Sequence, residues 1–184
     1  MSSNFQHKFE VSANGQPEQG IHKVCMFVVH GNDLLCLVRE HKDGTASVEP
    51  PGGKIDTKPC GARETPEEAL VREAAEELNI QIKPLAFVGV EPHPHTGKPV
   101  GYYMCEHVSG EPINNLEDEH LGIVRVPLSN LQGLKEDCAR EIWGDRPVDY
   151  RIPDNLLTKA LYKLNELTHS AGQRYNFGKD FLLT

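Results

Sequence analysis

Residues 52–78, GGKIDTKPCGARETPEEALVREAAEEL, combine an irregular glycine-rich segment with a strongly predicted helix. The helix is expected to begin after Thr65, because Thr65 is a good N-cap, Pro66 suits the first helical position and Glu68 completes a T-x-x-E capping box. The segment before it has neither helical nor strand periodicity. A long irregular loop in front of a densely acidic helix is therefore the feature from which fold and function are predicted.

On a helical wheel, the residues after Thr65 separate into an apolar arc and an acidic arc. The apolar arc is expected to pack on a sheet and consists of Leu70, Val71, Ala74, Ala75 and Leu78. Glu73, Glu76 and Glu77 lie together on the neighbouring arc. Like charges at these spacings cost about 0.2–0.5 kcal/mol per pair, so a cation is expected to offset them.

Two sources of positive charge could offset the three carboxylates. Arg72 lies four residues before Glu76 and four after Glu68, so one interpretation is a solvated acidic face stabilised by this arginine. The other is a hard divalent ion, since Mg²⁺ prefers carboxylate oxygens and often bridges them to substrate phosphates. The helix alone leaves both interpretations open.

Residues in front of the helix favour the metal interpretation. Gly52 and Gly53 let the backbone approach closely, so a carbonyl at this turn could join the carboxylates as a ligand. Glu64 is an isolated acid just outside the helix, and an ion pair with Arg72 would fix the loop to the helix. The glycine turn, the isolated acid and the run R-E-x-x-E-E together are far more specific than any one of them.

The combined pattern resembles the signature of the Nudix hydrolase family, Gx5Ex7REUxEExGU, in which U is an apolar residue. Gly53, Glu64 and the run REAAEELNI that begins at Arg72 match it. This chain departs from the signature in two places. Ten residues instead of five separate Gly53 from Glu64, and Asn79 stands in place of the closing glycine. Asparagine is the commonest substitute for glycine at a left-handed helix end.

The resemblance implies an α/β fold, an α/β/α sandwich with a mixed sheet, and Mg²⁺- or Mn²⁺-dependent hydrolysis. The bond cleaved would be the diphosphate bond of a nucleoside di- or triphosphate, or of a nucleoside diphosphate linked to another moiety. The metal ligands that it implies are the Gly53 carbonyl, Glu73, Glu76 and Glu77.

The resemblance also implies roles in catalysis. Glu64 and Arg72 would orient the loop and the helix, and Glu76 would be a metal ligand or the general base. Some family members take the base from a later loop, and in the acidic run 117–119 we choose Glu119 for this role. A solvated run of charges is the alternative for these three acids.

Candidate substrate contacts lie outside the signature helix. Lys54, Lys58 and Arg63 place positive charge beside the predicted phosphate site, although the extra loop residues could equally form an exposed bulge, because loop length costs little entropy. Tyr102 and Tyr103 alternate faces of a predicted strand. We choose Tyr103 as the candidate to stack on a base, with core packing as the alternative for both tyrosines.

Four histidines, His93, His95, His107 and His120, could suggest a transition-metal site. No thiolate or helix-spaced partner accompanies them, so we interpret them as polar loop residues.

From the rest of the sequence we predict an N-terminal arm over residues 1–20, followed by one domain over residues 21–184. Strands are expected at residues 21–29, 34–40, 85–90, 99–108 and 123–126, and a second amphipathic helix at residues 155–168. Their irregular alternation predicts a mixed sheet flanked by helices.

Composition restricts the partners and the compartment. The net charge of −8 disfavours long nucleic acid, so a small-molecule nucleotide is the expected partner. The five cysteines are odd in number and contain no CxxC pair, which predicts reduced thiols. No apolar run approaches the roughly 20 residues of a membrane span, and the polar start is unlike a signal peptide, so we expect a cytoplasmic protein without a membrane partner. Homodimer formation is left open.

Two other functions share the expected fold. One is a catalytically silent Nudix-like ligand sensor or interaction module, and the other is a prenyl diphosphate isomerase. Because Arg72 and all three helix glutamates are present, the sequence favours hydrolysis over both. The substrate itself depends on side chains outside the signature.

Overall fold

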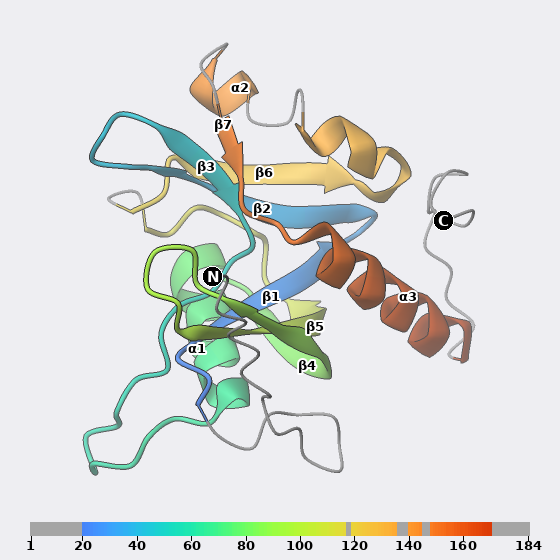
Figure 1. Cartoon of the computed structure of the whole chain (residues 1–184). Coiled ribbons are helices and arrows are strands. Elements are labelled where there is room, and N and C mark those ends of the chain that lie inside the picture. Colours follow the sequence, from blue (N-terminus) through green and yellow to red (C-terminus); the bar gives the residue numbers. More distant parts are fainter. Residues whose placement is uncertain (1–19, 117–118, 136–139, 145–147, 171–184) are drawn as a thin grey trace, which may run out of the picture.

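A seven-stranded mixed sheet with a helix on each face forms the body of the protein in a computed structural model, which describes residues 20–116, 119–135, 140–144 and 148–170 (Figure 1). The strands are β1 (Lys23–His30), β2 (Asp33–Glu40), β3 (Ala46–Glu49), β4 (Gln81–Pro92), β5 (Pro99–Ser109), β6 (Gly122–Pro127) and β7 (Val148–Tyr150). The helices are α1 (Pro66–Leu78), the 3₁₀ segment η1 (Leu128–Lys135), α2 (Arg140–Trp143) and α3 (Asp154–Ser170). Among the described helices, none is both long and apolar enough to cross a bilayer.

The strand order is β4-β5-β1-β2-β3-β7, with β6 paired to β2. β1 pairs parallel with β5, and β3 pairs parallel with β7. The other pairs are antiparallel, including the β1–β2 hairpin. The predicted mixed sheet is therefore confirmed.

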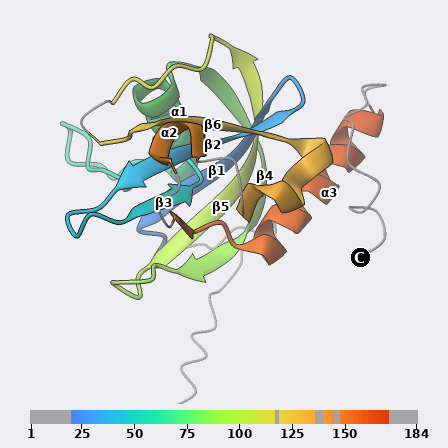
Figure 2. The ribbon, with the colours of Figure 1, turned by 90° about the horizontal axis from the view of Figure 1, so that it is seen from above.

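Alternating strand residues build one core on each side of the sheet, as expected for a period of two residues. On β1, Val24, Met26 and Val28 face α1, whereas Cys25, Phe27 and Val29 face α3. Figure 2 shows the two helices on opposite sides of the strands. This arrangement is the predicted α/β/α sandwich.

The chain that follows β3 pairs with the first half of β1. The amides of Met26 and Val24 donate to the carbonyls of Pro51 and Gly53 at 2.8 and 2.9 Å. The amide of Ile55 donates back to the His22 carbonyl at 3.1 Å. These bonds hold the Gly52–Gly53 turn at the end of the sheet, directly in front of α1.

Helix α1 begins and ends as predicted, but it buries a different face. Thr65 is the N-cap and forms both bonds of the capping box with Glu68. Val71 is 46% exposed and Ala75 is also exposed, so their predicted packing on the sheet is wrong. The buried stripe is shifted toward the acidic arc and consists of Ala69, Leu70, Glu73, Ala74, Glu77 and Leu78. The shift brings two of the three helix glutamates under the glycine turn.

Most other predicted elements are confirmed, with small changes in their ends. β4 extends beyond the predicted residues 85–90 at both ends. β3, α2 and β7 were not predicted, because they are too short to show periodicity. Residues 1–19 of the predicted arm and residues 171–184 lie outside the described part of the chain.

Asn79 ends α1 in the left-handed conformation that its place in the signature suggests. Its φ and ψ are 56° and 34°, and its amide donates to the Ala74 carbonyl. We expect Asn79→Ala to lower the free energy of unfolding by about 1 kcal/mol, because alanine lacks the local hydrogen bonding that lets asparagine adopt this conformation. Asn79→Gly should keep the wild-type free energy of unfolding, because glycine adopts the left-handed conformation without strain. Urea denaturation of the two variants checks this, and equal stabilities would contradict it.

Candidate active site

The Gly52–Gly53 turn lies against two carboxylates of α1. The Gly52 amide donates to Glu77 Oε2 at 2.7 Å. A Cβ atom added at Gly53 would lie 2.0 Å from Glu73 Oε1, and one added at Gly52 would lie 2.1 Å from the Val24 carbonyl oxygen. Only glycine therefore fits at either position, because any side chain would displace a carboxylate or the backbone of β1.

Glu73 and Glu77 are buried carboxylates, with exposures of 8% and 3%, whereas Glu76 is exposed. Burial raises the pKa of Glu73, although Arg72 acts in the opposite direction. Taking carboxylates out of water is costly unless a cation or hydrogen-bond donors compensate. The pair is therefore suited to receive positive charge.

Arg72 joins the loop to the helix, as the sequence predicts. Its Nε and Nη2 donate to the two oxygens of Glu64 at 2.9 and 3.0 Å. Nη1 donates to Glu73 at 2.7 Å and to Glu76 at 2.9 Å, and Nη2 also donates to the Lys54 carbonyl at 2.8 Å. The bond from Arg72 lowers the pKa of Glu64, and the bond to Glu64 raises the pKa of Arg72. This planar fork fixes the loop and three glutamates around one cation.

His120 holds the other buried carboxylate and was not recognised as a site residue. The side chain is 2% exposed, and Nε2 lies 2.9 Å from Glu77 Oε1. Its buried Nδ1 has no hydrogen-bond partner among the described residues. A proton on Nε2 satisfies this arrangement best, so His120 donates to Glu77. Each Glu77 oxygen then accepts one hydrogen bond and keeps a free lone pair for a ligand.

Glu119, the base that we chose from the later loop, lies beside this pair. Glu119 Oε2 is 3.5 Å from Arg39 Nη2, and the same nitrogen is 3.5 Å from His120 Nε2. Arg39 Nε lies 2.9 Å from Glu49 Oε1. Arg39 therefore lies between the exposed Glu119 and the His120–Glu77 pair, close to Nε2 but without a hydrogen bond to it, because the proton of Nε2 is donated to Glu77. The other two acids of the run, residues 117 and 118, lie outside the described part of the chain.

The extra residues before Glu64 form a closed tongue (residues 57–63), which extends at the lower left of Figure 1. Thr57 and Arg63 form an antiparallel bridge, and the Lys58 amide donates to the Ala62 carbonyl at 2.7 Å. At the base of the tongue, the Glu64 amide donates to the carbonyl of residue 56 at 2.9 Å. The two ends of the insertion are therefore bonded to each other, so the Gly52–Gly53 turn and Glu64 keep their contacts with α1.

The basic side chains of this loop bond to other parts of the protein. Lys58 Nζ lies 2.6 Å from Glu68 Oε1 in the first turn of α1, and Arg63 donates to the Ile21 carbonyl before β1. Both of these side chains therefore have partners other than Glu73 and Glu77. The Lys54 side chain is exposed.

The two neighbouring tyrosines lie on opposite faces of β5. Tyr103 is 1% exposed and packs edge to face on Phe87, with ring centroids 5.3 Å apart. It belongs to the core under α1, so base stacking by Tyr103 is corrected to core packing. Tyr102 lies on the opposite face of β5 and lines two pockets.

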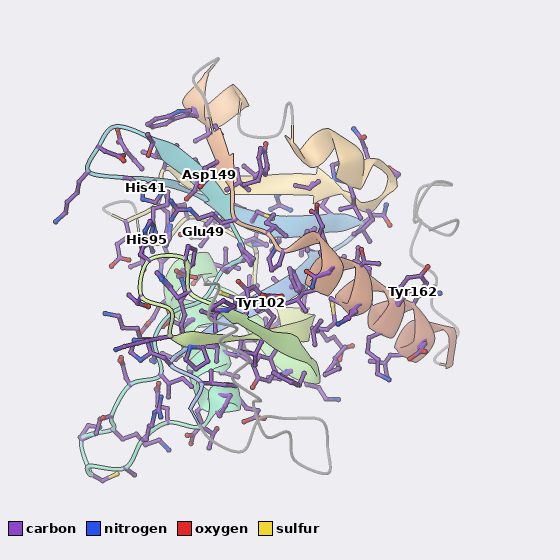
Figure 3. The ribbon with its side chains drawn as sticks, in the orientation of Figure 1. His41, Glu49, His95, Tyr102, Asp149 and Tyr162 are labelled. Atoms are coloured by element: carbon purple, nitrogen blue, oxygen red, sulfur yellow. The ribbon has the colours of Figure 1, made fainter. Side chains whose placement is uncertain are left out.

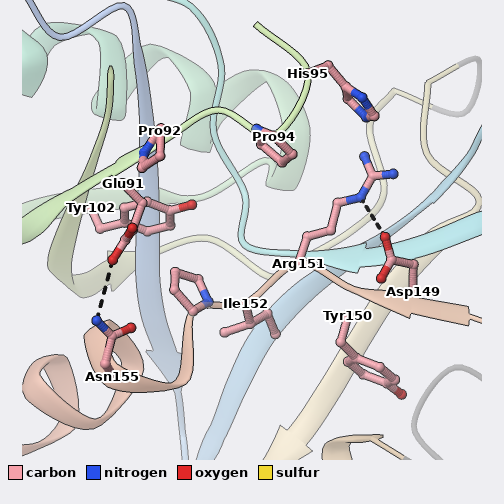
Figure 4. Close-up of a pocket in the computed structure, with 11 residues that line it drawn as sticks. Glu91, Pro92, Pro94, His95, Tyr102, Asp149, Tyr150, Arg151, Ile152 and Asn155 are labelled. Atoms are coloured by element: carbon pink, nitrogen blue, oxygen red, sulfur yellow. Dashed lines mark hydrogen bonds and ion pairs between the residues drawn. The ribbon is translucent and has the colours of Figure 1, made fainter. Parts of the chain in front are cut away.

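The larger pocket has a volume of about 500 Å³, within the usual range for small-molecule sites. Its lining includes Glu91, His95, Tyr102, Arg151 and Asn155 (Figure 4). A smaller pocket of about 60 Å³ adjoins it and shares Tyr102 and Arg151. Figure 3 shows His95, Tyr102, Glu49 and Asp149 around the same end of the sheet, away from Tyr162 on α3. The wall from Asp149 to Asn155 comes from a segment without a sequence motif.

Oxygen donors at the turn fit a hard divalent ion. Glu73 and Glu77 supply buried carboxylates, Glu76 an exposed one, and the Gly53 carbonyl accepts the Val24 amide and keeps a second lone pair. Among the described residues, no three His, Cys, Asp or Glu side chains converge into a closed metal cage. Arg72 instead forms ion pairs with Glu73 and with Glu76.

Comparisons with known proteins agree with this geometry. The family model described as NUDIX domain matches residues 21–143. A NUDIX hydrolase from Nitrosomonas europaea is 15% identical with a TM-score of 0.54, and the alignment covers 90% of this chain and 97% of that one. A NUDIX family hydrolase from Clostridium perfringens is 19% identical with a TM-score of 0.53, covering 81% and 99%. A UDP-X diphosphatase is 14% identical with a TM-score of 0.51, covering 88% and 68%. These likenesses concern the fold, and no curated protein sequence matches this chain.

The closed base of the tongue allows a direct test of its role. We expect replacement of residues 57–63 by Asn-Gly, a two-residue turn that suits closely facing chains, to leave kcat and KM within about twofold of the wild-type values. The reason is that, among the described residues, the tongue bonds only to itself, to the first turn of α1 and to Ile21 just before β1. Steady-state kinetics on the substrate found in a nucleotide panel measures both constants. A KM that rises about tenfold or more would instead show that the tongue contacts substrate.

Proposed function

This chain belongs to the family of NUDIX domain hydrolases, and we propose that it is an Mg²⁺- or Mn²⁺-dependent pyrophosphohydrolase. Its substrate would be a nucleoside di- or triphosphate, or a nucleoside diphosphate linked to another moiety. The observation that carries the proposal is the pair of buried carboxylates, Glu73 and Glu77, pressed against the Gly52–Gly53 turn. A net charge of −8 would repel a diphosphate, so the site needs a cation there.

A divalent ion bound at the turn would neutralise diphosphate charge and lower the pKa of a bound water. Glu73, Glu77 and the Gly53 carbonyl would hold it, and Glu76 would join them or accept a proton. The two hydrogen bonds to Glu64 would keep the Arg72 guanidinium in place if a bound metal took over its bonds to Glu73 and Glu76.

The proton of the attacking water needs an acceptor near the turn. Glu119 is exposed and lies one residue from His120, which contacts Glu77. Glu76 is exposed on α1 itself. Both can exchange a proton with solvent after each turnover, as a general base must.

The larger pocket is the proposed site for the nucleoside. Tyr102 forms one side of it, and its ring is stacked on Phe27 with centroids 5.8 Å apart. Glu91 and Asn155 form a hydrogen bond of 3.4 Å across another side (Figure 4). A carboxylate and an amide can accept from ribose hydroxyls or pair with a base edge. A cytoplasmic location fits the described cysteines, all of which are free thiols.

Removing the charge of Glu77 tests the proposed metal site. We expect Glu77→Gln to lower kcat by at least about 100-fold, because the amide cannot neutralise a divalent ion. Glu67→Gln, in the first turn of the same helix, should keep wild-type turnover. Phosphate release is measured on a panel of nucleotides with Mg²⁺, with identification of the products.

An unchanged rate in Glu77→Gln would contradict the metal site. A wild-type protein that hydrolyses nothing on the panel yet binds one of its nucleotides would instead indicate a ligand sensor. Isomerisation of isopentenyl diphosphate without hydrolysis would indicate the prenyl diphosphate isomerase.

The role of His120 is tested through metal affinity rather than turnover. We expect His120→Leu to weaken Mn²⁺ binding by about 10–100-fold, because it removes the donor that orients Glu77. His120→Gln should retain most of the affinity, since its amide can still donate to Glu77. Titration followed by electron paramagnetic resonance measures bound Mn²⁺, and thermal melts confirm folding. Equal Mn²⁺ affinity in both variants and the wild type would rule out this positioning role.

A further inference from the structure

Lys23 is a cation that lines the small pocket. It begins β1 two residues before Cys25, so its side chain lies on the α3 face of the sheet with Cys25 and Tyr102. It lines the pocket of about 60 Å³. Within the described part of the chain, its ammonium makes no hydrogen bond and no ion pair within 4 Å. Burial lowers its pKa, but the influence of Cys25, Glu49 and Glu77 outweighs burial and raises it, so the side chain is charged.

Three side chains that can donate to an anion line the small pocket, namely Lys23, His93 and Arg151, together with one carboxylate, Glu49. Burial lowers the pKa of His93, the charges of Lys23, His95 and Arg151 lower it further, and Glu49 opposes them.

The acids around the pocket are already paired. Glu49 also lines it, but Arg39 Nε lies 2.9 Å from Glu49 Oε1. Asp149 lines the larger pocket and lies 3.1 Å from Arg151 Nε (Figure 4). Each of these two carboxylates therefore has an arginine partner, whereas the Lys23 ammonium has no ion-pair partner within 4 Å among the described residues.

The position of Lys23 connects the glycine turn to the nucleoside pocket. The next residue, Val24, donates its amide to the Gly53 carbonyl, so Lys23 lies one residue from the proposed metal site. On its other side, the small pocket shares Tyr102 and Arg151 with the larger one. Its volume of about 60 Å³ equals that of about two liquid waters, which suits one phosphate group but not a base.

We propose that Lys23, with His93 and Arg151, forms a phosphate-binding subsite between the glycine turn and the nucleoside pocket. It would hold the phosphate on the nucleoside side of the scissile diphosphate bond, with the Lys23 ammonium donating to non-bridging oxygens. The assignment of that phosphate rests on the proposed function. The anion site itself does not, because it needs neither metal nor turnover.

His93 is a built-in reporter for the test. Full-length protein in EDTA is titrated with inorganic pyrophosphate, and the imidazole resonances of His93 are followed by NMR. We expect a saturable shift in the wild type and an apparent affinity at least about tenfold lower in Lys23→Met, because a charge-assisted hydrogen bond is lost. Lys23→Arg should keep the affinity. Lys159→Met, which removes an exposed charge on α3, is the matched control and should behave as the wild type.

A His93 shift that is equal in the wild type and Lys23→Met, or no His93 shift in the wild type, would overturn the subsite. In free Lys23→Met, the pKa of His93 should also rise, since one cation near it is removed. If pyrophosphate binds through Lys23 but no nucleotide is hydrolysed with Mg²⁺, the subsite stands and the proposed hydrolysis falls. If the wild type hydrolyses a nucleotide but Lys23→Met binds pyrophosphate as tightly as the wild type, the proposed hydrolysis stands and the subsite falls.

Discussion

The close approach of the Gly52–Gly53 turn to α1 is the constraint on which the rest of the site depends. Backbone bonds to β1 fix the turn from one side, and the carboxylates of Glu73 and Glu77 close it from the other. There is no space for a side chain at either glycine. The packing of a sheet and a helix thereby places backbone oxygens beside two buried acids, which is the environment that a hard divalent ion requires.

The two buried carboxylates are held in different ways. Glu77 accepts one hydrogen bond on each oxygen, from His120 and from the Gly52 amide, so its orientation is fixed. Glu73 shares the Arg72 guanidinium with Glu64 and Glu76. We infer that Glu77 is the preorganised ligand, and that Glu73 must exchange part of its bond to Arg72 for a metal.

Local chemistry allowed the sequence to predict the parts of the site that lie within one segment. The capping box at Thr65, the left-handed Asn79 and the Arg72–Glu64 pair all follow from neighbouring residues. His120 and Lys23 could not be predicted in this way, since the residues that surround each of them are distant in sequence. Residue spacing shows that adjacent strand residues face opposite sides, but the two faces were distinguished only when α1 and α3 were placed on them.

Contacts between distant parts of the chain also decided how the tongue is placed and which face of α1 is buried, so the sequence did not predict either. Residue counting showed an insertion before Glu64, whereas the bridge between Thr57 and Arg63 shows that it leaves the turn in place. The helical wheel for α1 gave the correct periodicity, but it placed the buried face too close to Val71. The reason is that the buried face was chosen from apolar residues alone, whereas Glu73 and Glu77 are also buried. In this protein the acidic side of the helix is also packing surface, and it lies against backbone instead of against apolar side chains.

Anomalous diffraction from crystals soaked in Mn²⁺ tests the central claim most directly. A metal held by the turn and the helix predicts an anomalous peak within coordinating distance of the Gly53 carbonyl, Glu73 and Glu77, with Arg72 still bonded to Glu64. Bound Mn²⁺ found only elsewhere on the protein, or no peak at the turn under saturating Mn²⁺, would contradict the account.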